Sequence, residues 1–165
     1  MPQVDDFDNF YRASRSRLLG FVYALTGDAG EAQDAVQEAF VRAWQRWATV
    51  SQHGDPEAWV RVTAARIAVS RWRQLRSRAR AYVRHGPPPL VPEPDSDTVE
   101  VVRALRRLPE EQRIALALYH LVGLSVADVA RETEVPVGTT KARLARGRAA
   151  LARLLAVDAK GTADA

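Results

Sequence analysis

Apolar residues recur along most of the chain at spacings of three and four, which is the period of an amphipathic helix. Short groups of polar, glycine or proline residues separate these stretches and mark where helices end and begin. The pattern predicts helices over residues 6–25, 29–48, 56–84, 98–108 and 109–122. A short helix, a tight turn and a second helix follow within residues 125–153. We therefore expect an all-α protein.

Residues 85–97 interrupt the helical pattern, because they hold five prolines and a glycine. Proline removes an amide donor and disfavours a helical conformation in the residue before it. This stretch is expected to form a semi-rigid linker between two helical domains, at residues 1–84 and 98–155. Residues 156–165 are mostly small or polar, and we expect a disordered tail there.

Composition excludes several classes of protein and site. The chain has no cysteine, which rules out disulfides and thiolate metal sites and is compatible with the cytoplasm. It starts without the basic and apolar segments of a signal peptide, and no apolar run could cross a bilayer. We therefore expect a cytoplasmic protein without membrane insertion. The net charge is only +4, but the basic residues are unevenly distributed.

The last predicted helix carries small and basic side chains on the face opposite its apolar stripe. No acid occurs between Val135 and Val157. A helix of this kind, after a short helix and a tight turn, is typical of a helix-turn-helix that enters the DNA major groove. Arginine can bind guanine there with two hydrogen bonds. The alternative is an ordinary amphipathic helix with a solvated basic face.

A second basic stretch covers residues 58–92, where eight arginines occur without any acid. Solvated surfaces usually mix both signs of charge. Arginines can bind phosphates, and the interleaved Trp59 and Trp72 can stack on unpaired bases. For the two tryptophans, packing in the hydrophobic core is the competing interpretation.

The predicted helix over residues 29–48 has a polar face that combines acids, an amide and a large aromatic side chain. Such a mixture suits the binding of another protein, because aromatic residues and arginine often anchor interfaces. The alternative is that Trp44 belongs to the core and that the acids are merely solvated. The pattern alone does not decide between them. The residues of this face are Asp34, Gln37, Glu38, Arg42 and Trp44.

Both halves resemble a known family, the bacterial sigma factors of the extracytoplasmic-function (ECF) class, of the type common in actinobacteria. Residues 27–47 (GDAGEAQDAVQEAFVRAWQRW) and 55–73 (DPEAWVRVTAARIAVSRWR) resemble region 2 of these proteins. Residues 108–151, which include SVADVARETEVPVGTTKARLARGRAAL, resemble region 4. The resemblance implies two helical domains that bind core RNA polymerase and direct it to promoters, without a cofactor or a metal.

The resemblance also implies which residues contact the polymerase. In the family, a D-x-x-Q-E stretch of region 2 docks on the clamp coiled coil of the β′ subunit. This stretch falls on Asp34, Gln37 and Glu38, with Arg42 and Trp44 nearby, which favours an interface on this face. The β flap of the polymerase is a second expected partner. Members of the family are often held by an anti-sigma protein, and no residue here identifies one.

The expected contacts with promoter DNA follow from the same resemblance. The loop over residues 49–55, which contains His53, corresponds to the loop that captures a flipped-out base of the −10 element. The next helix would line the melted strand through Trp59, Arg61, Arg66, Arg71 and Arg73. The −35 element would be read by the second helix of the helix-turn-helix, through Thr139, Lys141, Ala142, Arg143 and Arg146.

The sequence departs from the family pattern at a few of these positions. Many relatives have an asparagine near Arg66 and an aspartate near Ser70, so recognition of the −10 element is expected to differ in detail. Thr140 replaces a usual valine, and Ala142 replaces a usual serine. The loss of that hydroxyl affects the expected −35 preference rather than binding itself.

Two other classes of function remain for comparison. A dimeric helix-turn-helix repressor or activator would explain residues 125–153 but neither the basic stretch at 58–92 nor the acidic face. An enzyme is not supported, because the sequence has no phosphate-binding glycine loop and no nucleophile paired with a base. His53, His85 and His120 lie far apart, without the spacing of metal ligands.

Overall fold

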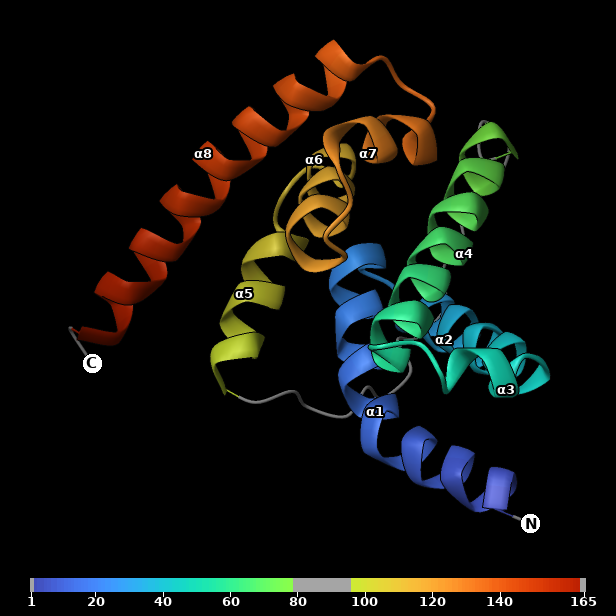
Figure 1. The fold of residues 1–165 in the computed structure, drawn as a ribbon. Helices are drawn as coiled ribbons and strands as arrows, with labels where there is room; N and C mark the ends of the chain where they lie inside the picture. The colour runs from blue at the N-terminus through green and yellow to red at the C-terminus, as the bar shows by residue number, and fades with distance from the viewer. Residues whose placement is uncertain (1, 79–95, 164–165) are drawn as a thin grey trace. The chain divides into compact units, whose positions relative to one another are not determined.

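The computed structural model describes residues 2–78 and 96–163, and every regular element in these residues is a helix (Figure 1). The chain divides into two compact units, Met1–Pro92 and Glu93–Ala165, called here the N-terminal and C-terminal units. The expected all-α fold with two helical domains is confirmed. Most of the predicted linker at residues 85–97 lies outside the described residues.

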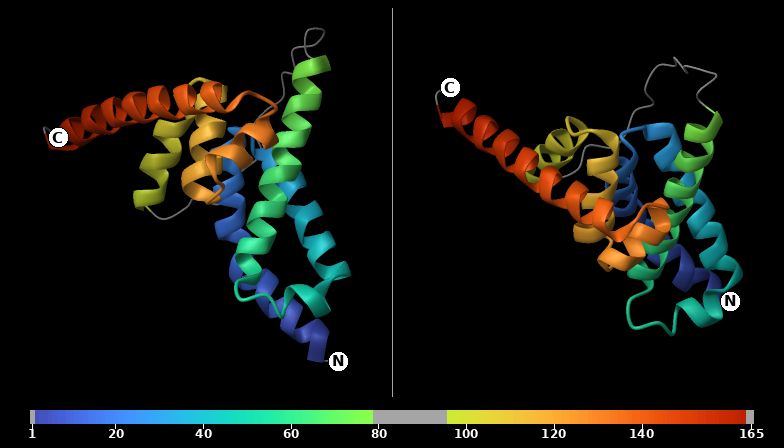
Figure 2. Two further views of the ribbon diagram at one scale, coloured as in Figure 1. Left: turned by 45° about the horizontal axis from the view of Figure 1, so that its top comes forward. Right: turned by 90° about the horizontal axis from the view of Figure 1, so that it is seen from above.

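The N-terminal unit contains α1 (Pro2–Thr26), α2 (Ala29–Gln45), the short α3 (Trp47–Val50) and α4 (Pro56–Arg78). The helices α1, α2 and α4 pack against one another, as Figure 2 shows from two further directions. Asp28 caps α2 by accepting the Glu31 amide at 2.9 Å. The core of this unit is built from small and aliphatic side chains, among them Leu18, Val22, Leu25, Ala32, Ala35, Ala39, Val60, Ala64 and Val69.

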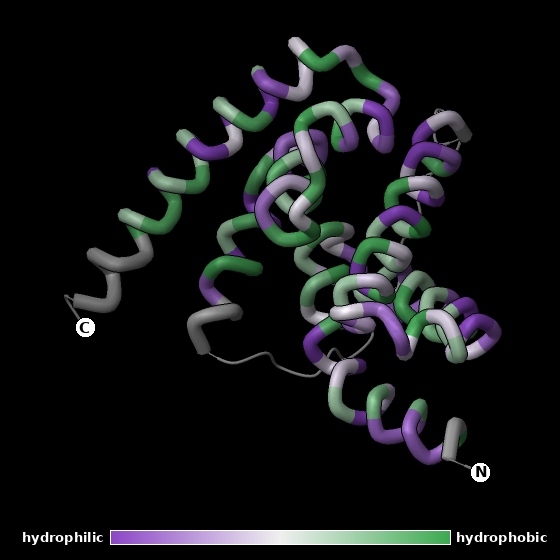
Figure 3. Tube along the Cα trace, viewed as in Figure 1, coloured by the Kyte–Doolittle hydropathy of each residue, from purple (hydrophilic) through white to green (hydrophobic). Residues whose placement is uncertain are grey.

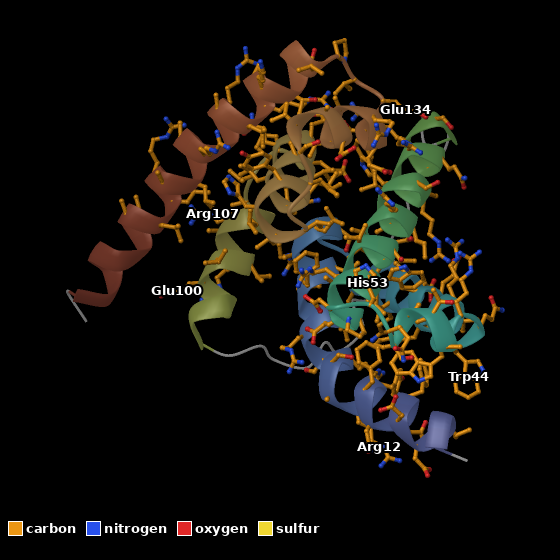
Figure 4. The ribbon with its side chains drawn as sticks, viewed as in Figure 1. Arg12, Trp44, His53, Glu100, Arg107 and Glu134 are labelled. Atoms are coloured by element: carbon orange, nitrogen blue, oxygen red, sulfur yellow. The ribbon has the colours of Figure 1, made fainter. Side chains whose placement is uncertain are left out.

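Aromatic side chains join α1 to α2 and α3. Phe7 of α1 is the centre of this group, with its ring centroid 5.0 Å from that of Trp44 and 5.1 Å from that of Trp47. Trp47 is buried, whereas Trp44 is 45% exposed and lies at the edge of the group (Figure 4). The remaining members are Phe10, Tyr11 and Phe40.

The C-terminal unit contains α5 (Ser96–Arg106), α6 (Glu110–Leu116), one turn of π-helix η1 (Ala117–Leu121), α7 (Val126–Thr133) and α8 (Val137–Ala163). Gly123, with φ +80°, ends the helical run of α6 and η1 in the left-handed conformation that glycine adopts easily. Ser125 caps α7 by accepting the Asp128 amide at 3.0 Å. Glu134, also left-handed at φ 56°, forms the turn between α7 and α8 (Figure 4).

The helix α8 packs its apolar stripe against α6 and α7. Polar and apolar segments alternate along α8 in Figure 3, as expected for an amphipathic helix. Thr140 and Leu144 of the stripe are buried, and Gly147 lets α8 approach α6 closely. A Cβ atom at Gly147 would lie only 3.0 Å from Cδ1 of Leu116. Val137, at the start of the stripe, is 43% exposed instead of buried.

Several expected boundaries differ from the structure. The helix predicted over residues 29–48 ends at Gln45, because Arg46 leaves the helical conformation (φ −122°) before α3 begins. The disordered tail expected at residues 156–165 is wrong as far as Ala163, where α8 ends. Residues 156–163 contain no proline, the residue that interrupts a helix most strongly, and α8 continues through them. Residues 79–84 of the third predicted helix lie outside the described residues.

None of the described helices combines the length and the apolar character that a membrane span requires.

Candidate nucleic-acid and protein interfaces

The first three turns of α8 present a basic surface, called here the α8 face. Thr139, Lys141 and Arg146 are exposed on it, while Ala142 and Arg143 are half-buried. Thr139, Ala142, Arg143 and Arg146 share one side of the helix, away from the buried Thr140 and Leu144, whereas Lys141 lies on the other flank. The structure therefore groups four of the five residues expected at the −35 element. The face is preceded by the tight Glu134 turn, as a helix-turn-helix requires.

Arg148, another arginine of α8, contacts residues of η1. The Nε of Arg148 donates a hydrogen bond to Nε2 of His120 at 3.1 Å, and the guanidinium lies 5.3 Å from the Tyr119 ring centroid. Partial burial lowers the pKa of His120, and the positive charge of Arg148 lowers it further. Since Nε2 accepts the hydrogen bond from Arg148, His120 is neutral in this arrangement.

Three of the residues expected at the −10 element share one side of α4. Trp59, Arg66 and Arg73 follow one another at seven-residue spacing, which is two helical turns. Trp59 and Arg66 line a hollow of about 390 Å³ between α2 and α4. This hollow, called here the α4 hollow, has an aromatic wall and three arginines. Its residues are Arg42, Gln45, Arg46, Trp59, Thr63 and Arg66.

The other two arginines expected at the −10 element lie elsewhere on α4. The guanidinium of Arg61 is 5.7 Å from the ring centroid of Phe21 in α1, and its buried Nε has no hydrogen-bond partner. Arg71 points to α2, where it binds Glu38. The five residues of α4 therefore do not form a single surface. Trp72 is half-buried and lies under Arg76, whose guanidinium is 5.3 Å from its ring centroid.

The loop before α4 is held by local contacts. His53 is exposed there (Figure 4), and its Nδ1 accepts the Asp55 amide at 3.4 Å. Asp55 also caps α4 by accepting the Ala58 amide at 2.9 Å. Arg17 of α1 donates two hydrogen bonds to Glu57, at 3.1 and 2.7 Å, and fixes the start of α4. These hydrogen bonds and the charge of Glu57 raise the pKa of Arg17.

The polar face of α2, called here the α2 face, is exposed as expected. Asp34, Gln37, Arg42 and Trp44 are exposed, and Glu38 is half-buried. Trp44 is not a core residue, although one side of its ring rests on the aromatic group around Phe7. The structure therefore brings the five residues of the expected polymerase contact together.

The acids of the α2 face are paired with arginines. The two oxygens of Glu38 bind different partners, Oε1 with Arg42 at 2.5 Å and Oε2 with Arg71 at 2.6 Å. A second nitrogen of Arg71 lies 3.9 Å from Asp34. These four residues are called here the charge cluster. Sequence reasoning did not place Arg71 in it, because Arg71 and Glu38 are 33 residues apart.

Sequence reasoning also missed three residues of the α4 hollow. Gln45 and Arg46 follow Arg42 by about one helical turn, so the sequence already indicated that they lie beside it. Thr63 carries no feature in the sequence that would have indicated a place in this hollow. In the part of the chain that the structure describes, no group of three or more His, Cys, Asp or Glu side chains could hold a metal ion.

Comparison with known proteins gives both units the same family. Residues 10–78 match Sigma-70 region 2, and residues 98–151 match Sigma-70, region 4. The ECF RNA polymerase sigma factor SigC of Mycobacterium tuberculosis (strain CDC 1551 / Oshkosh) is 35% identical over 147 residues, which cover 86% of this chain and 79% of SigC. SigM of Mycobacterium tuberculosis (strain ATCC 25618 / H37Rv) is 31% identical over 150 residues, covering 90% and 76%.

A solved structure has the same fold. The sigma factor RpoE, in complex with the anti-sigma factor NepR from Bartonella quintana, matches with a TM-score of 0.55 and 25% identity. The match covers 93% of this chain and 98% of RpoE. The region 2 match accounts for the N-terminal unit, which a helix-turn-helix repressor would leave unexplained. The chain belongs to the ECF sigma factors and directs RNA polymerase to promoters.

Proposed function

We propose that the three surfaces divide the work of promoter recognition. The α2 face binds core RNA polymerase, the α4 hollow engages the melted −10 element, and the α8 face reads the −35 element. One observation carries this proposal: each unit has a long helical stretch without acidic residues. These stretches are Ala58–Arg78 in α4 and Val137–Ala156 in α8. Two separate cationic helices suit two separate segments of one promoter.

The α8 face is tested by a pair of arginine variants. An arginine that binds guanine contributes about 1–3 kcal/mol of discrimination, so Arg146→Ala should weaken binding to a −35 duplex by about 5- to 150-fold. Arg153 is exposed on the same helix about two turns further on, and Arg153→Ala is the matched control. The measurement is the affinity of reconstituted holoenzyme for promoter DNA at fixed salt. Equal effects of the two variants would contradict the assignment of the α8 face.

The α4 hollow suits an extruded base. Its Trp59 offers a stacking surface, and Arg46 and Arg66 offer charge for the backbone phosphates. Unpairing costs a few kcal/mol, which stacking and phosphate contacts can offset. Trp59→Ala should therefore slow the opening of a duplex promoter. Transcription from a template with a pre-melted −10 region should be reduced much less. An equal loss on both templates would mean that Trp59 acts in some other step.

The α2 face is tested by removal of its amide and one acid. We expect the Gln37→Ala/Glu38→Ala variant to lose association with core polymerase while the C-terminal unit stays folded. A pull-down with core polymerase measures the first property, and circular dichroism measures the second. Unchanged association would refute the assignment of this face.

An anti-sigma protein is a further proposed partner. The matched RpoE structure is a complex with such a protein, NepR, and its fold is shared by most of this chain. A protein of this class would act in the cytoplasm, where the polymerase works. Competition between core polymerase and a candidate anti-sigma protein for the purified chain tests this, and simultaneous binding of both would argue against competition.

A further inference from the structure

The charge cluster connects the α2 face, which we propose binds polymerase, with α4, which is expected to contact DNA. Asp34, Glu38 and Arg42 lie on α2, in the face proposed to bind polymerase, whereas Arg71 lies on α4 among the residues expected to contact DNA. The structure joins them through the 2.6 Å ion pair between Arg71 and Glu38 and the 3.9 Å approach of Arg71 to Asp34. The position of Arg71 is thus set by α2.

The two acids of the cluster need a cation between them. Asp34 and Glu38 are four residues apart on α2, and like charges at this spacing repel each other. Arg71 places one terminal nitrogen towards each carboxylate, and Arg42 takes the remaining oxygen of Glu38. With both oxygens bound, the Glu38 side chain is held in one orientation.

The same contacts make Arg71 a poor ligand for a DNA phosphate. Both of its terminal nitrogens face carboxylates, and the side chain is only 32% exposed. A phosphate that approached it would be repelled by Asp34 and Glu38. Arg66, in contrast, lines the α4 hollow.

We propose that Arg71 is a positioning residue for polymerase binding and does not contact the −10 strand. Its guanidinium holds Asp34 and Glu38 in the arrangement that the polymerase recognises. A face whose side chains are arranged in advance binds its partner without the entropic cost of ordering them. This inference rests on the proposed role of the α2 face in polymerase binding.

The test separates polymerase binding from DNA binding in the full-length chain. Arg71→Gln keeps a long polar side chain but removes the charge, and Arg76→Gln is the matched control on the same helix. Arg71→Gln should weaken binding to core polymerase about fivefold, the effect expected for a partly exposed ion pair, whereas Arg76→Gln should not. With core polymerase at saturation, the Arg71→Gln holoenzyme should bind a single-stranded −10 oligonucleotide as tightly as the parent holoenzyme.

A double-mutant comparison gives an independent check. In a chain that already carries Glu38→Gln, the Arg71→Gln change should have a much smaller effect on core binding, because its main partner is lost. If the two effects simply multiply, the proposal is overturned. It is also overturned if Arg71→Gln leaves core binding unchanged, or if it weakens oligonucleotide binding at saturating polymerase.

Folding and the proposed function are controlled separately. Tryptophan fluorescence during denaturation shows whether the N-terminal unit of each variant is folded. Should Arg71→Gln unfold, Arg71→Lys keeps the charge without the two-pronged geometry and should show a smaller loss in the same assay; no loss would overturn the proposal. If the parent chain itself does not bind core polymerase, the proposed function of the α2 face fails, and this inference fails with it.

Discussion

Substitution of Thr140 by valine tests how the C-terminal unit is packed, because the structure predicts a gain and not a loss of stability. The Thr140 side chain is 1% exposed, and its hydroxyl donates to the Pro136 carbonyl at 3.3 Å, which is long for a hydroxyl donor. The same carbonyl already accepts the Thr140 amide at 3.0 Å. Thr140→Val would therefore leave the carbonyl of Pro136 with a partner and replace a poorly bonded buried hydroxyl by a methyl group.

The expected change in the free energy of unfolding can be worked from these contacts. Burial of the extra methyl group contributes about 0.8 kcal/mol. Burial of the hydroxyl costs about 0.5–2 kcal/mol, and its long hydrogen bond returns only about 0.5 kcal/mol. Thr140→Val should thus stabilise the C-terminal unit by about 1 kcal/mol. For a unit of this size, the melting temperature should rise by about 4–8 °C.

A second buried threonine provides the control. Thr133 is 7% exposed, and its hydroxyl donates to the Val129 carbonyl at 2.7 Å, which is a normal hydrogen bond. Thr133→Val sacrifices that bond, so we expect a change near zero or a small loss of stability. Scanning calorimetry of the full-length chain measures both variants.

The chain contains an internal reference for this experiment. All four tryptophans lie between residues 44 and 72, so their fluorescence follows the N-terminal unit alone. The fluorescence transition should stay in place in both variants. A lower melting temperature of the C-terminal unit in Thr140→Val, or an equal rise in Thr133→Val, would refute the reasoning about the hydroxyl groups.

Three further predictions concern the same unit. Because the pKa of His120 is lowered in the folded state, His120 of the unfolded chain is protonated first as the pH falls, and stability should decrease below about pH 6.5. His120→Gln should reduce this decrease in denaturation curves recorded from pH 7 to 5. Gly147→Val should cost about 1–3 kcal/mol, because even a Cβ atom meets Leu116 at 3.0 Å; a stable variant in denaturant titration would contradict the close packing. Glu134→Val places a β-branched residue at φ 56° and should cost about 1–2 kcal/mol by calorimetry, whereas Glu134→Gly should be tolerated.

The helices could be predicted because the signals for them are local. Spacing of apolar residues and caps such as Asp28 and Ser125 act within one or two turns, and each was visible in the sequence. The break at Arg46 carries no glycine or proline, so it gave no signal. The continuation of α8 to Ala163 was missed because its small and polar residues, Gly161 among them, favour the end of a helix.

The candidate sites were predictable as faces but not as contacts. Helical periodicity alone places the residues of the α2 face together, and also those of the α8 face except Lys141. The environment of Arg61 and Arg71 depends on which helices pack against α4, and that depends on contacts between residues far apart in the chain. A run of arginines therefore suggested one cationic surface, whereas packing assigns Arg61 to Phe21 and Arg71 to Glu38.

The separate cores of the two units affect whether a damaging mutation is dominant over an intact copy of the gene. Each unit buries its own apolar residues, so we expect the N-terminal unit to stay folded when a substitution melts the C-terminal unit. With the assignments proposed above, such a damaged chain would still occupy polymerase but could no longer find a −35 element. Loss of one half would then harm a cell that also carries an intact copy of the gene, because the defective product competes for the shared enzyme.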